Sequence, residues 1–192
     1  LEKMPEGKRI AIGWLSAFGE GLAMLAAAGG PEAHPHLHSR AEDRTRWDRK
    51  KIAEGTALVE GALRGGTPGA YGVQAAIAAL HAHAPSAAET DWPQIAALYD
   101  VLARLHDSPV VALNRAVAVA MAHGYERGLA LLDQLELPGY HRLPAARADL
   151  LRRMKRFAEA AAAYRDALAL VSNQSERRFL ERRLAEVLSK LG

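Results

Sequence analysis

The sequence predicts an all-α protein, a right-handed array of antiparallel helical hairpins with about eight helices. Its composition is the first reason: 49% of the residues are hydrophobic but only 6% are aromatic, so alanine and leucine supply most of the apolar side chains. Alanine is the strongest helix former and is depleted in strands. The second reason is that the sequence has no run of alternating β-branched and aromatic residues of the kind that predicts a strand.

The third reason is a repeat with an offset of 32 residues in residues 108–192. Residues 113–120 align with residues 145–152, and Gly128 aligns with Ala160. Each copy has an apolar-periodic helix, a short polar turn and a second helix that opens on an aromatic residue. This length, with small residues where helices cross, is typical of tetratricopeptide-like (TPR-like) repeats. Such hairpins stack because one hairpin cannot bury its apolar face alone, so we expect an α-solenoid with a partner-binding groove.

The N-terminal part is expected to be separate, with residues 1–40 forming a helix and a linker and residues 41–192 forming the repeat domain. Residues 10–28 are apolar and predict a helix loosened by glycines, with a cleaved signal peptide as the alternative. Gly29-Gly30-Pro31 ends this helix, and residues 31–41 predict a linker rich in proline and histidine.

The first helix of the repeat domain is predicted over residues 44–63. Trp47 and Leu58 fall on or near one apolar face, and charged residues lie elsewhere. Asp43 is the expected N-cap, because its carboxylate can accept a hydrogen bond from an amide of the first turn. A glycine-rich stretch at residues 65–69 ends the helix.

Start signals place the next helices. Residues 71–84 predict an alanine-rich helix. Asp91 with Pro93 predicts a helix start, because proline fits the first turn, where its missing amide is not needed. Ser108 and Pro109 repeat this signal, with the serine expected to cap. The remaining helices are predicted over residues 109–122, 125–136, 140–153, 157–171 and 175–191.

Charge and cysteine content limit the setting of the protein. The formal net charge is only +3, but residues 140–192 contain twelve Lys or Arg and six Asp or Glu. This basic C-terminal part either contacts nucleic acid or an acidic partner, or consists of solvated helix faces with Glu–Arg pairs. The sequence has no cysteine, which excludes disulfides and cysteine-based zinc sites and favours the cytoplasm. No membrane association is expected.

No catalytic motif is apparent, so we expect a protein that is not an enzyme and needs no cofactor. The sequence has no phosphate-binding glycine loop with its lysine, no paired-carboxylate motif and no His-Glu-x-x-His helix. His34, His36 and His38 are weak candidates for a metal site, because imidazole is a common ligand. They lie in a proline-interrupted linker without a suitably spaced carboxylate, so no metal site is predicted.

Two groups of residues are candidates for binding a partner. The first is a Trp among charged residues at a predicted helix start, where Asp and Arg side chains form a local network or grip a partner. It comprises Asp43, Arg46, Trp47, Asp48 and Arg49. The second lies near equivalent repeat positions and comprises Asn114, Arg115, Arg147 and Asp149. We favour buried ties between helices for this second group, with lining of the groove as the alternative.

The chain resembles the C-terminal extension of one group of extracytoplasmic-function (ECF) RNA polymerase sigma factors. The motif at residues 43–49 (DRTRWDR), followed by residues 52–55 (IAEG), is similar to a characteristic stretch of that extension. The similarity continues through residues 71–100, 108–124 and 138–187, the last with its GYHRLPAARADLLRR and ERRFLERRLAEV blocks. It covers about residues 41–187.

The resemblance implies a TPR-like domain that follows two sigma domains, which bind core polymerase and read the promoter. The extension regulates the sigma domains or docks them to polymerase or to a signalling protein. We expect no sigma domain in this chain, because the 40 residues before the Trp motif are too few to hold two of them. DNA recognition is therefore not carried over to any residue here.

The function expected from the sequence is thus a non-catalytic regulatory domain of an ECF sigma factor that acts in transcription initiation. Its expected partner is a protein: sigma domains in the same chain, core RNA polymerase or a signalling protein. Two alternatives remain open. One is a stand-alone helical-repeat protein that binds nucleic acid through its basic C-terminal face, and the other is a protein that binds a metal or a small ligand.

Overall fold

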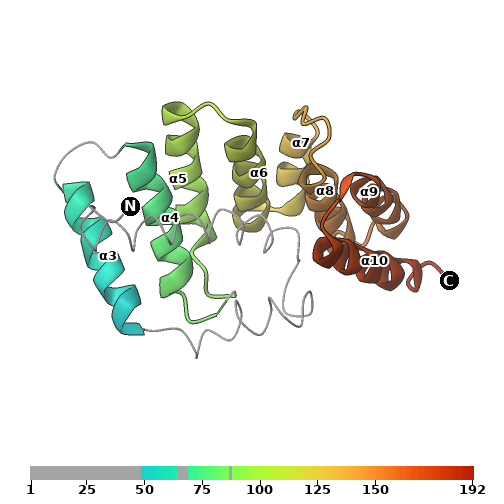
Figure 1. Ribbon diagram of the computed structural model, residues 1–192, viewed down its shortest axis with the longest axis horizontal. Helices are drawn as coiled ribbons and strands as arrows, with labels where there is room; N and C mark the ends of the chain where they lie inside the picture. Colours follow the sequence, from blue (N-terminus) through green and yellow to red (C-terminus); the bar gives the residue numbers. More distant parts are fainter. Residues whose placement is uncertain (1–48, 65–68, 87) are drawn as a thin grey trace.

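The computed structural model describes residues 49–64, 69–86 and 88–192, and in these ranges it contains eight α-helices and no strand (Figure 1). The predicted all-α class is confirmed. The expected helix at residues 10–28, the linker at residues 31–41 and the start of the following helix lie outside the described residues. The helices are α3 (Arg49–Arg64), α4 (Ala70–His83), α5 (Trp92–Leu105), α6 (Pro109–His123), α7 (Tyr125–Leu132), α8 (Arg142–Arg153), α9 (Phe157–Leu170) and α10 (Gln174–Leu188).

The helices follow one another across the molecule in chain order (Figure 1). Each helix packs against the helices directly before and after it, and α6 also contacts α8. The 32-residue repeat corresponds to the hairpins α6–α7 and α8–α9. Contacts between neighbours, with few between distant elements, are what an array of stacked hairpins produces.

The apolar interior consists of two clusters that share α6. One cluster joins α4, α5 and α6 and includes Ile77, Ile95 and Val111. The other runs from α6 to α10 and includes Leu113 and Tyr164. Helix α6 therefore buries residues on two sides, which explains why its sequence is rich in alanine and valine rather than amphipathic.

Small residues lie where α6 and α7 cross, as the repeat predicts. A Cβ atom placed on Gly128 would lie 2.2 Å from Cβ of Ala120 and 2.7 Å from the carbonyl oxygen of Ala116. Carbon atoms in ordinary contact are about 3.5–4.0 Å apart, so only glycine fits at this crossing. The equivalent residue of the next hairpin, Ala160, is fully buried.

Two of the predicted helix starts have different outcomes. Asp91 caps α5 as expected, because its carboxylate accepts a hydrogen bond of 3.0 Å from the amide of Gln94. Ser108 lies at the N-cap position of α6, but its side chain makes no capping hydrogen bond, so that part of the prediction is wrong. Pro109 at the first helical position lacks an amide, which leaves fewer donors for a cap to satisfy.

The connection between α7 and α8 is longer than predicted. Helix α7 ends at Leu132 rather than residue 136, because the next amides bond to carbonyls three residues back instead of four. Gly139 has a φ of +77°, a conformation that favours glycine, and the amide of Tyr140 bonds to the carbonyl of Leu137. These turns delay the start of α8 to Arg142.

Candidate functional site

The Trp motif and the histidine group fall largely outside the part of the chain that the structure describes. This holds for Asp43, Arg46, Trp47 and Asp48, and for His34, His36 and His38. Arg49 is the first residue of α3. Partner binding by these residues stays a prediction. Among the described residues, no group of three or more His, Asp or Glu side chains could hold a metal ion.

Arg115 and Arg147 form ties between neighbouring helices. The Nε atom of Arg115 in α6 lies 2.5 Å from a carboxylate oxygen of Asp100 in α5. Arg147 in α8 lies 3.0 Å from the carboxylate of Asp133, which follows α7, and a terminal nitrogen lies 3.5 Å from the carbonyl oxygen of Leu132. Arg115 reaches Asp100, and Arg147 reaches Leu132, across the same separation of 15 residues. The expected helix-to-helix ties are found at both repeat positions.

Arg177 makes a similar contact in α10. Its terminal nitrogen donates a 2.8 Å hydrogen bond to the carbonyl oxygen of Val171, at the end of α9. In three successive cases, an arginine of one helix therefore bonds to the C-terminal part of the helix before it. Positive charge is favourable there because the last carbonyls of a helix have no partner within the helix.

Asn114 belongs to the packing between α5 and α6. Burial raises the pKa of the Tyr99 hydroxyl, and a hydrogen bond with the Asn114 side chain partly opposes this shift. Asn114 lies next to Arg115 in α6, so both residues attach α6 to α5.

Asp149 organises a cluster of charges within α8. Its side chain is 1% exposed, and one carboxylate oxygen lies 2.6 Å from a terminal nitrogen of Arg152. The other oxygen lies 2.7 Å from Nε of Arg153. Both ion pairs run within α8, at spacings of three and four residues, so they differ from the expected tie to another helix. The contribution from another helix is Tyr164 of α9, whose pKa is raised by burial and then by the charge of Asp149.

The two arginines of α8 are permanent cations. Burial lowers the pKa of each guanidinium, but the charge of Asp149 and its hydrogen bonds outweigh burial, so the pKa of Arg152 and of Arg153 lies above its usual value. Arg153 also lies 5.8 Å from the ring centroid of Tyr125, in cation–π geometry. These groups can bind anions, but they cannot exchange protons near neutral pH.

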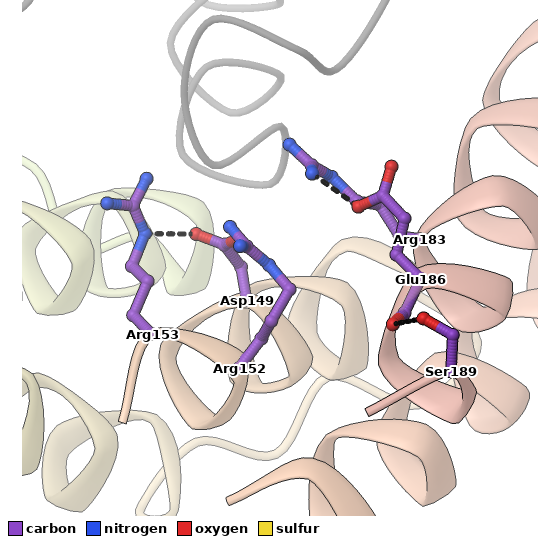
Figure 2. Close-up of polar contacts among 6 residues, drawn as sticks. All are labelled: Asp149, Arg152, Arg153, Arg183, Glu186 and Ser189. Carbon is purple, nitrogen blue, oxygen red and sulfur yellow. Dashed lines mark hydrogen bonds and ion pairs between the residues drawn. The ribbon is translucent and has the colours of Figure 1, made fainter. Parts of the chain in front are cut away.

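Helix α10 contributes a second charged pair. Arg183 lies 2.7 Å from a carboxylate oxygen of Glu186 and 5.5 Å from the ring centroid of Phe179. Ser189 donates a 2.8 Å hydrogen bond to the carbonyl oxygen of Glu186. Figure 2 shows that the charged side chains of α8 and α10 point to the same side of the helices. We call this set the arginine surface; it consists of Asp149, Arg152, Arg153, Arg183 and Glu186.

The N-terminal ends of α8 and α10 are held together by Glu176. One of its carboxylate oxygens lies 2.9 Å from Nε2 of His141, and the other lies 3.3 Å from a terminal nitrogen of Arg142. Since Glu176 lies in the first turn of α10 and Arg142 begins α8, the two helices start side by side. This contact fixes the position of the two halves of the arginine surface relative to each other.

The sequence reasoning had not singled out Arg152, Arg153, Arg183 or Glu186. A signal was present, because an acid lies three or four residues from each arginine, a spacing that brings side chains together on a helix. Both helical segments also belong to the two sequence blocks that carry the family resemblance. None of the described helices is long and apolar enough to cross a membrane.

Comparison with known proteins gives one informative similarity. The chain is 44% identical over 145 residues to an uncharacterized protein of Rhizobium meliloti (strain 1021). The aligned region covers 74% of this chain and 34% of that relative, so it spans about a third of the relative's length. No protein-family model matches the chain, and no solved structure matches it.

Proposed function

We propose that this chain is a non-catalytic regulatory domain of an ECF-type RNA polymerase sigma factor, which acts in the cytoplasm by binding a protein. The observation that carries the proposal is the arrangement of stacked helices that present a fixed charged surface on α8 and α10. Stacked hairpins of this kind are used for binding, because they combine a rigid scaffold with an extended surface. In finer detail we propose a right-handed TPR-like solenoid.

The sequence resemblance supports the attachment to a sigma factor. It covers about residues 41–187, which includes all eight described helices. The Rhizobium relative is also much longer than the region it shares with this chain, since 66% of it lies outside the alignment. That length leaves room for further domains, as the proposal requires. The proposed partners are sigma domains of the same protein, core RNA polymerase or a signalling protein.

Co-purification tests this proposal. The tagged chain is mixed with isolated sigma domains from the same organism and, separately, with core RNA polymerase, and the retained proteins are measured. Asp48→Ala/Arg49→Ala changes the Trp motif, and Asp166→Ala/Arg165→Ala is the matched control, an adjacent exposed acid–base pair of α9. We expect the chain to retain one of these partners and the first double variant to weaken retention, with the control unaffected. Retention of neither partner contradicts the proposal.

Nucleic-acid binding is the second candidate, favoured by the excess of positive charge in residues 140–192. It predicts an affinity for duplex DNA that falls steeply with salt, because each neutralised phosphate releases counterions. A titration at about 50 mM and about 200 mM salt decides between the two candidates. Absent or salt-independent binding removes the nucleic-acid function.

A further inference from the structure

We infer that the arginine surface binds an acidic segment of a protein partner through its carboxylate side chains. This inference rests on the proposed function and adds the chemistry of the partner. The first support is charge: the surface carries three guanidinium groups and two carboxylates, and it lies in a region with twelve basic and six acidic residues. Its field attracts negative charge and speeds the approach of an acidic partner.

The second support is orientation. Arg153 is fixed by Asp149 on one side and by the ring of Tyr125 on the other, and Arg183 is fixed by Glu186 and Phe179. A guanidinium that is already oriented loses little conformational freedom when it binds. Its planar arrangement of donors matches the two oxygens of a carboxylate, which lysine does not.

The third support separates a protein partner from nucleic acid. The side chains of Arg152, Arg153 and Arg183 are 21%, 20% and 4% exposed, so they offer a few directed hydrogen bonds. A phosphate backbone is instead followed by rows of cations that face solvent. At the equivalent repeat positions, α6 has Val117 and Met121 where α8 has Asp149 and Arg153. Because α6 contacts α8, a segment with acidic and apolar residues side by side fits both helices.

Fluorescence anisotropy with the full chain tests the inference. The probe is a fluorescein-labelled peptide of repeated Glu-Glu-Leu units, and the control probe has Gln-Gln-Leu units instead. The salt concentration is about 50 mM, where charge interactions are strong. We expect saturable binding of the glutamate peptide alone. Arg153→Gln is expected to weaken it at least about tenfold, the loss of a charge-assisted hydrogen bond.

Two further variants control for fold and for charge. Arg165→Gln removes the same charge from an exposed position of α9 and is expected to change the affinity less than about twofold. Arg153→Lys keeps the charge beside Asp149 but loses the planar donor pair, so it is expected to bind with intermediate affinity. If circular dichroism shows that Arg153→Gln is unfolded, Arg153→Lys provides the comparison with Arg165→Gln.

Several results overturn the inference. Equal binding of the glutamine peptide shows that charge is not recognised, and equal effects of Arg153→Lys and Arg165→Gln show that the surface is not the site. Duplex DNA that binds more tightly than the peptide and depends on Arg153 makes the surface a nucleic-acid site. The titration uses neither polymerase nor sigma domains. A positive titration with failed co-purification therefore removes the sigma-factor assignment alone, and the opposite pair of results removes the acidic partner alone.

Discussion

Replacement of Gly128 by alanine tests the close contact between α6 and α7. The added Cβ would lie 2.2 Å from Cβ of Ala120 and 2.8 Å from its Cα. Ordinary contact needs about 3.5–4.0 Å, so the helices must separate by about 1.5 Å. None of the blocking atoms can rotate away, because they belong to the backbone or to an alanine Cβ.

The expected loss follows from two opposing effects. Over-packing of an interior costs about 1–3 kcal/mol, and we expect the upper end because the helices themselves must move. Alanine recovers up to about 1 kcal/mol through its higher helix propensity. The free energy of unfolding should therefore fall by about 2 kcal/mol, which lowers the melting temperature by about 4–8 °C for a chain of this size.

Urea and thermal unfolding followed by circular dichroism at the helix band measure this loss. Gly61→Ala is the matched control: it makes the same chemical change within α3, where an added Cβ has no atom within 4 Å. The control should gain about 0.5–1 kcal/mol, since only helix propensity changes. If Gly128→Ala is as stable as the control, the described contact between α6 and α7 is wrong.

Three further predictions concern the polar contacts. Asp149→Asn removes the carboxylate that neutralises two partly buried guanidinium groups and should cost about 3 kcal/mol in urea unfolding; an unchanged midpoint would contradict the cluster. The raised pKa of Tyr164 means that the folded state holds the neutral phenol, so stability is full below about pH 10 and is lost above it. Tyr164→Phe should make the decline in urea midpoint between about pH 9 and 11 less steep, and an identical decline would exclude this source. Glu176→Gln should weaken the contact between α8 and α10 by about 1 kcal/mol and speed amide exchange in α10, whereas unchanged protection would show that the contact adds no stability.

Much of the fold could be predicted from local signals. Apolar periodicity and alanine content indicated the helices, and Asp91 with Pro93 indicated where α5 begins. The small residue at position 128 was expected at a helix crossing because of the repeat. The end of α7 was not predictable, because residues 133–136 carry no strong helix breaker and leave the helix through three-residue turns.

The polar contacts were only partly predictable. The ties of Arg115 and Arg147 were expected, since equivalent positions of a repeat face equivalent neighbours. The local pairing of Asp149 was not expected, although two arginines follow at helical spacing. The contact between Arg142 and Glu176 spans 34 residues, which differs from the repeat offset and depends on how α10 packs. Such a pair requires the tertiary structure.

The position of α6 between the two apolar clusters has a consequence for folding cooperativity. Helices α4 and α5 complete one cluster and α7 to α10 complete the other, so each side forms a potential foldon that uses α6 as a common wall. Detachment of either side exposes one flank of α6 while the other flank stays covered. Hydrogen exchange should therefore show α6 as the last described helix to open, and substitutions in α6 should change how strongly unfolding at one end promotes unfolding at the other.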